Sequence, residues 1–359
     1  MKRLVITLAL AVVLLVALTA PAGASTAVWQ PSVVAELAAG DYGTFMEGMA
    51  ADSHGRLFLS LTAWGYYDET VDPSLWESNI GEVWRVAPNG HKTRVATKDL
   101  SPNGMFSGVA VDRLDRLYVG VSDFGDPQTL GSGVYRVGPG GSLHKVMAMR
   151  AGTWPNGLAC RDGRIFVTDS VTGAVWRARI GSGVASPAAP WFQDALLAPG
   201  DPEADPTLWG LGANGIAFRS DKLFVSVSDF GRIVRIPVKA DGLPGVPRVI
   251  CEQPKLKSAD GIAFDALGGL WIVTNAGATG VNPAGALYRL SPAAGLWQIA
   301  DDPGWLNYPT MPVFGTSTGT RSTLYVENGA YFSYDDLVGP DIQALAVGVA
   351  GLPLFQEAP

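Results

Sequence analysis

The chain of 359 residues has little cysteine, histidine or charge. It contains two cysteines and three histidines, and Asp, Glu, Lys and Arg together make up 16% of it. Neither cysteine stands beside a histidine in a recognisable local pattern, which argues against a thiol hydrolase. We expect Cys160 and Cys251 to be free thiols, because the repeat described below places them in strands that do not meet.

Basic clusters and long apolar segments are also scarce. The net charge is −7 and Lys and Arg do not gather beyond the first three residues, which disfavours nucleic acid and anionic membranes as partners. One apolar run, residues 4–18, is too short to indicate a membrane span. It follows Met1-Lys2-Arg3 and precedes Ala22-Gly23-Ala24, which is the layout of a secretory signal peptide. We therefore expect cleavage of residues 1–24 and a secreted or periplasmic mature chain that no membrane holds.

The chain does contain a repeated sequence motif, called a phrase below. Asp260-Gly261-Ile262-Ala263-Phe264 begins with an acidic residue, and a Gly268-Gly269 turn leads to a second apolar run, which predicts a β-hairpin. Similar phrases recur at intervals of 46 to 60 residues. A period near fifty with strand–turn–strand content predicts the blades of a propeller. The first residues of the six phrases, called the head residues below, are Glu47, Ser107, Asn156, Asn214, Asp260 and Thr310.

The predicted fold is all-β, a six-bladed β-propeller with four-stranded antiparallel blades formed by residues 25–359. Residues 32–37 form a predicted strand without a blade of their own, so we expect them to close the ring at the outer edge of the last blade. The third strand of that blade is expected within residues 341–349. Second strands end in an Asp or Asn, the last one as Glu327-Asn328-Gly329, and we expect these ends mainly to bond turn backbone.

The head residues carry the candidate chemistry. Inner strands of a propeller run beside its axis, so equivalent first positions form a ring around it. Two carboxylates and two amides there would repel or stay partly unpaired without a counter-ion. We therefore predict a metal ion held by Glu47, Asn156, Asn214 and Asp260. The alternative is a ring of polar residues that bond ordered water.

The oxygen donors of this predicted site favour Ca²⁺, with Mg²⁺ and Mn²⁺ as less favoured ions. Zinc is disfavoured because no head residue is His or Cys. Aromatic residues in the predicted connections would converge on one face and line a partly apolar pocket, unless they only pack in the core or at the rim. These residues are Trp64, Tyr66, Tyr67, Trp76, Trp154, Trp209, Trp305 and Tyr308.

In their order and spacing, the head residues resemble those of the senescence-marker-protein/gluconolactonase/luciferin-regenerating-enzyme superfamily of six-bladed propellers. That group includes calcium-dependent diisopropylfluorophosphatase and the paraoxonases. The resemblance implies a catalytic Ca²⁺ at the axis, with Glu47, Asn156, Asn214 and Asp260 as its ligands. It implies metal-assisted hydrolysis of a small molecule, a lactone or a related ester, with Asp260 as general base or nucleophile and Glu47 mainly as a ligand.

The resemblance also suggests how a substrate would be held. Asn156 and Asn214 would fix its geometry, Ser107 and Thr310 would line the channel, and Trp154 and Trp209 would contact it. Trp154 stands where the gluconolactonase branch keeps an Arg for sugar lactones, which puts a sugar acid lactone in doubt. The His pair of the paraoxonases is absent too, since the three histidines, His54, His91 and His144, fall in predicted turns or an outer strand.

Two other readings of the sequence remain open. The sequence also fits a non-catalytic propeller that binds a ligand or a protein, with a structural metal or none. It also fits a strictosidine-synthase-like enzyme, a group that shares the fold without the metal ligands. Fold alone does not decide among the three functions.

Overall fold

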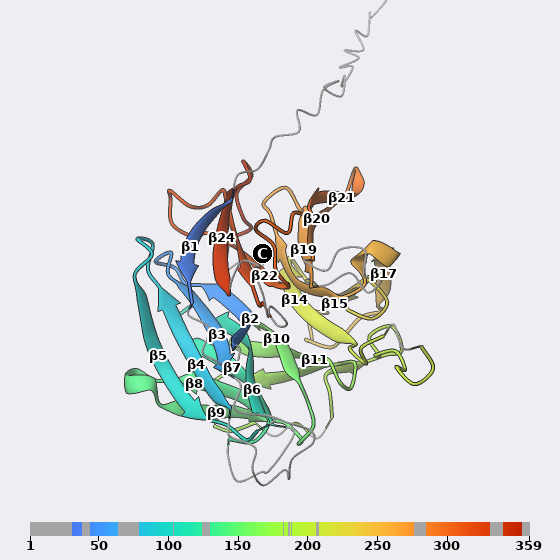
Figure 1. Ribbon diagram of the computed structural model, residues 1–359. Helices are drawn as coiled ribbons and strands as arrows, with labels where there is room; N and C mark the ends of the chain where they lie inside the picture. Colours follow the sequence, from blue (N-terminus) through green and yellow to red (C-terminus); the bar gives the residue numbers. More distant parts are fainter. Residues whose placement is uncertain are drawn as a thin grey trace, which may run out of the picture. The chain divides into compact units, whose positions relative to one another are not determined.

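The structure is a computed structural model that describes residues 31–37, 44–63, 79–102, 104–123, 130–181, 183–185, 187, 189–205, 208–275, 285–330 and 340–353. The strands in these ranges form six four-stranded antiparallel sheets, each built from strands that are neighbours in the sequence apart from the last. The predicted six-bladed propeller is therefore confirmed. Figure 1 shows the sheets arranged as blades around a central axis.

The first three blades follow the chain in order. Blade one consists of β2 (Thr44–Ala51), β3 (Leu57–Ala63), β4 (Ile80–Val86) and β5 (Lys92–Asp99). Blade two consists of β6 (Gly104–Val111), β7 (Leu117–Asp123), β8 (Gly133–Val137) and β9 (Leu143–Ala148). Blade three consists of β10 (Pro155–Arg161), β11 (Arg164–Asp169), β12 (Ala174–Arg179) and the short β13 (Phe192–Gln193).

The next two blades have the same layout. Blade four consists of β14 (Ala213–Arg219), β15 (Lys222–Val227), β16 (Arg232–Pro237) and β17 (Arg248–Glu252). Blade five consists of β18 (Ala259–Phe264), β19 (Leu270–Thr274), β20 (Ala286–Ser291) and β21 (Gly295–Ala300). Two short 3₁₀ turns, η2 (Pro139–Gly141) and η3 (Pro254–Leu256), lie between strands.

Blade six joins the two ends of the propeller. It consists of β22 (Pro309–Phe314), β23 (Thr323–Asn328), β24 (Asp341–Ala346) and, at its outer edge, β1 (Ser32–Glu36). β1 runs antiparallel to β24, with Ser32 opposite Ala344 and Glu36 opposite Asp341. Both the closing strand and the third strand of the last blade are thus confirmed where the sequence predicted them. The pairing leaves β24 without an exposed edge.

The inner strands β2, β6, β10, β14, β18 and β22 contact one another in a closed ring. A glycine follows five of the six head residues and allows this close approach. A Cβ at Gly108 would lie 1.7 Å from the carbonyl oxygen of Asn156, and one at Gly215 would lie 2.2 Å from that of Asp260. Side chains at these positions would therefore force neighbouring blades apart.

The core lies between the blades. The second strands β3, β7 and β15 are buried along almost their whole length, because each of their faces packs against a neighbouring blade. Outer strands such as β5 and β17 are largely exposed. Burial thus falls from the axis to the rim, which is why the apolar runs of the sequence lie in the first and second strands.

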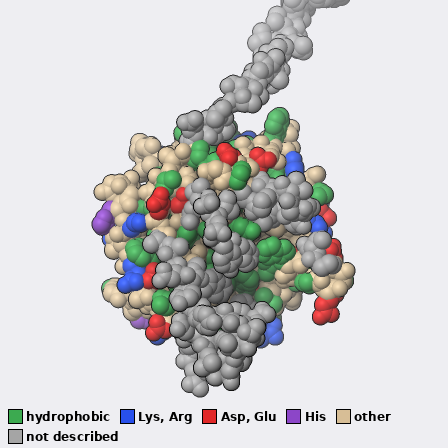
Figure 2. Space-filling model, viewed as in Figure 1, with side chains coloured by type: hydrophobic (Ala, Val, Ile, Leu, Met, Phe, Trp, Pro, Cys, Tyr) green, Lys and Arg blue, Asp and Glu red, His purple; other side chains and the backbone are tan. Residues whose placement is uncertain are grey.

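Both cysteines are free, as expected. Burial raises the pKa of the Cys160 thiol and also that of the less buried Cys251 thiol. Neither thiol therefore ionises readily. No helix among the described residues is both long and apolar enough to cross a membrane. On the face shown in Figure 2, the coloured acidic and basic side chains are interspersed.

Candidate metal centre at the propeller axis

Each head residue stands in a β-bulge of its inner strand. The pairing with the second strand shifts register around Glu47 in β2, between Pro155 and Leu158 in β10, and between Ala213 and Ile216 in β14. The same shift occurs between Ala259 and Ile262 in β18. A bulge bends the strand and turns a side chain out of its normal direction. The repeated bulge therefore places the head residues where their side chains leave the sheet.

Four of the head residues meet around one cavity. Glu47, Asn156, Asn214 and Asp260 all line it, together with the glycines that follow them and with apolar residues such as Met311. The free volume of this axial cavity is about 20 Å³. That is enough for one ion or one water molecule. All four side chains are buried, with Glu47 and Asp260 each 4% exposed.

Several polar atoms at the cavity have no hydrogen-bond partner among the described residues. They include Oε2 of Glu47, Oδ1 of Asn214 and the amide nitrogen of Asn156. A 180° rotation of the Asn156 amide exchanges its nitrogen and oxygen, so this side chain can also present an oxygen. Buried polar atoms without partners are costly. A cation with oxygen ligands would satisfy them, so the residues present fit Ca²⁺.

The charges at the axis also favour a bound cation. Burial raises the pKa of Glu47 well above its usual value, and the nearby Asp260 and Glu327 carboxylates raise it further. Burial also raises the pKa of Asp260 to about 7, against the opposing effect of Asn275 and Asn214. A divalent cation in the cavity would offset this repulsion and keep both carboxylates ionised.

Residues at the ends of the second strands orient two of the head residues. Asn275 Nδ2 donates to Asp260 Oδ2 at 2.8 Å. Asn214 Nδ2 donates to Ser228 Oγ at 3.0 Å, and Ser228 Oγ donates in turn to the carbonyl of Ala259 at 2.8 Å. Since the Asn214 nitrogen is occupied, its oxygen is directed to the cavity side. The second-strand ends at Asp169 and Asp229 bond turn backbone, as predicted, whereas Asn275 also supports the site.

The structure adds a third carboxylate that the sequence-based reasoning missed. Glu327 in β23 is fully buried, and its Oε2 accepts a hydrogen bond from Thr310 Oγ1 at 3.0 Å. Burial raises its pKa well above the usual value, Thr310 opposes this rise, and Asp260 adds to it. The sequence did contain a sign of this residue. The equivalent second-strand positions of blades one, three and four carry small hydroxyl residues, namely Ser60, Thr168 and Ser226, so a glutamate there departs from the repeat.

The remaining expected substrate residues do not line the cavity. Ser107 Oγ donates to the carbonyl of Pro155 at 2.8 Å, and Thr310 bonds Glu327. The backbone N–H groups of Trp154 and Trp209 donate to Asp169 and Asp229 at 3.1 and 2.9 Å. Trp209 is 50% exposed, whereas Trp305 is buried. Trp64, Tyr66, Tyr67 and Trp76 lie outside the described residues.

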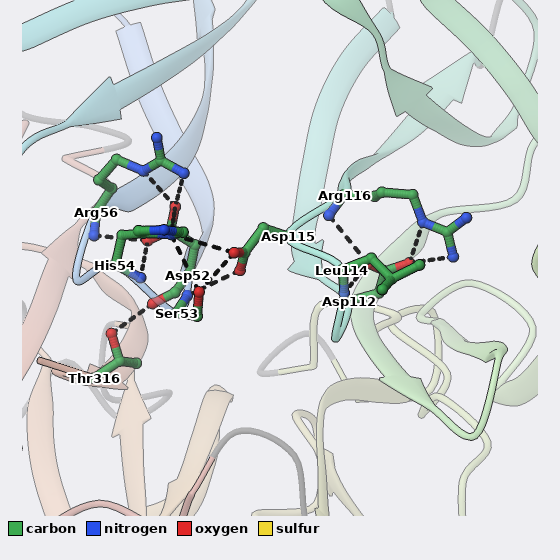
Figure 3. A network of polar contacts seen from close by, with 9 residues as sticks. All are labelled: Asp52, Ser53, His54, Arg56, Asp112, Leu114, Asp115, Arg116 and Thr316. Atoms are coloured by element: carbon green, nitrogen blue, oxygen red, sulfur yellow. Dashed lines mark hydrogen bonds and ion pairs between the residues drawn. The ribbon is translucent and has the colours of Figure 1, made fainter.

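A second group that could hold a metal lies on the surface. Ligand atoms of Asp52, His54 and Asp115 are all within 4.8 Å of one another. Figure 3 shows them between two hairpin turns, the β2–β3 turn of blade one and the β6–β7 turn of blade two. Asp115 Oδ2 lies 3.2 Å from Nδ1 of His54 and also accepts the hydroxyl of Ser53 at 2.6 Å.

The hydrogen bonds of Asp52 show that these residues stabilise a hairpin turn. Its Oδ1 accepts the N–H groups of His54 and Arg56, each at 2.9 Å, and its Oδ2 pairs with the Arg56 guanidinium. Asp112 does the same in blade two, bonding the N–H groups of Leu114 and Arg116 (Figure 3). The acceptors are therefore already used to fix a hairpin turn that recurs from blade to blade.

Comparisons with known proteins bear on the fold. No protein-family model matches the chain, and no curated protein matches it in sequence. Solved structures do match, two of them described as gluconolactonases, and they share the propeller fold that the resemblance of the head residues implied. At identities below 20%, these matches carry the fold and not the activity.

Three similar structures with TM-scores above 0.5 illustrate the match. A candidate gluconolactonase is 14% identical with a TM-score of 0.55, and the match covers 91% of this chain and 94% of that one. A gluconolactonase from Xanthomonas campestris is 19% identical with a TM-score of 0.52, covering 89% and 90%. An auxiliary nutrient binding protein from Bacteroides ovatus is 12% identical with a TM-score of 0.52, covering 90% and 74%.

Proposed function

We propose that this protein is an exported hydrolase that uses an axial Ca²⁺ to cleave a lactone or a related ester. The observation that carries the proposal is the convergence of Glu47, Asn156, Asn214 and Asp260 on one ion-sized cavity whose polar atoms lack partners. The gluconolactonases among the similar structures support the lactonase class. Ca²⁺ is the favoured ion, ahead of Mg²⁺ and Mn²⁺, because all candidate ligands are oxygens.

The residues divide into holding and reacting groups. Glu47, Asn156 and Asn214 would hold the ion, which when bound supplies a positive charge that polarises the substrate carbonyl oxygen. Asp260 would also be a ligand of the ion, which keeps its carboxylate ionised and able to accept a proton as a general base. The hydrogen bond from Asn275 fixes the direction of this carboxylate. A nucleophilic role of Asp260 would use the same orientation.

With an ion bound among Glu47, Asn156, Asn214 and Asp260, the substrate would approach it from the open side of the cavity. Trp154 directly precedes β10 and Trp209 lies four residues before β14, so both stand near the ends of inner strands that carry head residues. We propose that they contact an apolar part of the substrate. A small-molecule ester with apolar substituents fits this better than a sugar acid lactone.

Export rests on residues 1–24, whose basic start, apolar run and Ala-Gly-Ala end favour a cleavable signal peptide. Expression of the full chain with export, followed by N-terminal sequencing, is expected to give a mature protein that starts at Ser25. Recovery of the uncleaved chain in the cytoplasm would contradict the proposal.

Metal content and turnover together test the enzyme. The purified protein is expected to hold one Ca²⁺, and Asp260→Asn and Glu47→Gln are expected to lose it. Calcium-dependent turnover on a panel of lactones, aryl esters and phosphotriesters should vanish in Asp260→Asn. Glu252→Gln, on the exposed outer strand β17, serves as the matched control and should keep both properties.

The second candidate function is a non-catalytic binding propeller. It is favoured by the nutrient binding protein from Bacteroides ovatus, which is as similar in fold as the Xanthomonas campestris gluconolactonase. In that case the ion would be structural. Bound Ca²⁺ together with no turnover on any member of the panel would favour this function over the hydrolase.

A further inference from the structure

We propose that Glu327 belongs to the axial cation site as a third carboxylate, in addition to Glu47 and Asp260. This inference rests on the proposed function, since it concerns the same ion. Glu327 comes from β23, a second strand, whereas the other candidate ligands come from inner strands. It would give the site three negative charges and two amides.

The burial of Glu327 is the first observation. Its side chain is fully buried, and Oε1 has no hydrogen-bond partner among the described residues. Glu47 Oε2 is in the same state. An ionised carboxylate with a free oxygen in the interior needs a partner of opposite charge.

The protein supplies no such partner in the part of the chain that the structure describes. The groups that act on Glu327 are Thr310 and Asp260, and those that act on Glu47 are Asp260, Glu327 and Asn156. None of these is Lys, Arg or His. Three acidic residues therefore face one another without a cation from the chain, which an ion bound from solution would supply.

Comparison of the blades is the second observation. The equivalent second-strand residues of blades one, three and four are small hydroxyl residues that bond the carbonyl of the next head residue. Ser60 donates to Ser107 and Ser226 to Asp260, each at 2.6 Å, while Thr168 bonds Asn214. By the same geometry, residue 327 faces the next head residue around the ring, which is Glu47.

Glutamate at position 327 is longer than the hydroxyl residues and cannot donate that bond when ionised. Glu327 is not among the residues that line the axial cavity, but it is near enough for its charge to act on Glu47 and for the charge of Asp260 to act on it. The hydrogen bond from Thr310 to Oε2 then holds one oxygen and leaves Oε1 for another partner. Thr310 thus positions Glu327. This role explains why Thr310 is polar although it does not line the cavity.

Calcium titration by calorimetry tests the inference with two variants. Glu327→Gln keeps the shape and removes the charge, and Glu327→Ser restores the residue type of blades one and four. Each is expected to raise the Kd for Ca²⁺ at least tenfold, and to lower the preference for La³⁺ over Ca²⁺. Thr310→Val should raise the Kd less, by about threefold, and Glu252→Gln should leave it unchanged.

Thermal unfolding separates this role from a purely structural one. Metal-free Glu327→Gln is expected to unfold at a higher temperature than the metal-free native protein at pH 8, because a neutral amide replaces a buried acid that is costly to ionise. The gain in unfolding temperature on adding Ca²⁺ is expected to shrink. Calcium affinities of both Glu327 variants within threefold of the native value would overturn the inference and leave the proposed function intact. If the native protein, Asp260→Asn and Glu47→Gln alike bind no Ca²⁺, both proposals fail.

Discussion

Asn275 orients Asp260 through a hydrogen bond: its side-chain nitrogen donates to Asp260 Oδ2 at 2.8 Å and to the carbonyl oxygen of Pro309 at 3.2 Å. Asn275 follows the second strand of blade five, and Pro309 begins the inner strand of blade six. One amide therefore ties the candidate base to the neighbouring blade. Asp260 is oriented by the ring and not by its own strand alone.

Removal of this amide is expected to weaken the ion site without removing a ligand. Asn275→Ala should raise the Kd for Ca²⁺ by roughly tenfold to a hundredfold, the usual effect of losing a group that orients a ligand. Calorimetric titration measures this. Asn89→Ala, in an exposed turn where Asn89 only accepts the N–H of His91, is the control. Equal affinities of Asn275→Ala and the control would show that Asp260 needs no support.

The metal-free protein should become less stable as pH rises through neutrality. Burial raises the pKa of Asp260 from 3.8 to about 7, so its contribution to folding is fully present below pH 4 and is lost as pH rises through 7. Glu47 and Glu327 shift in the same direction. Thermal unfolding in a chelator should therefore give a lower Tm at pH 8 than at pH 5.

Calcium should reverse this pH dependence. Because the ion binds the ionised carboxylates, the rise in Tm on adding Ca²⁺ should be larger at pH 8 than at pH 5. Asp260→Asn should flatten both profiles, as it cannot titrate. A calcium-induced shift that is the same at both pH values would contradict the assignment of the site to buried acids.

Asp265 should matter for folding and not for the ion. Its buried carboxylate accepts the N–H groups of Leu267 and Gly269, the indole N–H of Trp271 and Nε of Arg289. Asp265→Ala leaves these donors unpaired and should cost about 3–5 kcal/mol of unfolding free energy, measured by urea denaturation. Asp241→Ala, in an exposed turn, should cost under about 1 kcal/mol.

A single methyl group at Gly108 should disturb the ring. Its Cβ would lie 1.7 Å from the carbonyl oxygen of Asn156, so Gly108→Ala must separate the inner strands of blades two and three. We expect a loss of roughly 3 kcal/mol or more in unfolding free energy, together with weaker Ca²⁺ binding through displaced Asn156. Gly319→Ala is the control because open space surrounds that position. Native stability of Gly108→Ala would contradict the tight packing.

The sequence was enough to predict the fold, because a propeller repeats one pattern of burial. The head residue, the glycine after it and the apolar run recur in five of the six inner strands, as at Asn214-Gly215 and Asp260-Gly261. The strand at residues 32–37 was predictable because it lacked a blade of its own. The regular repeat was therefore sufficient to predict how the strands are arranged in space.

The site was predictable only where it followed the repeat. The four candidate ligands share one position per blade, so spacing was sufficient to bring them together. Glu327 breaks the repeat, because it stands on a second strand where blades one and four carry a serine, and its carboxylate is bonded by Thr310. The support of Asp260 by Asn275 depends likewise on a contact between blades. Neither contact leaves a pattern in the spacing of the sequence.

The pairing of β1 with β24 has a consequence for how this chain is made. Residues 32–36 are among the first of the propeller to leave the ribosome, yet their partner, residues 341–346, is among the last. The ring cannot shut before nearly the whole polypeptide exists. An ion that needs ligands from blades one, three, four and five would consequently be captured only late in folding, when these blades have come together.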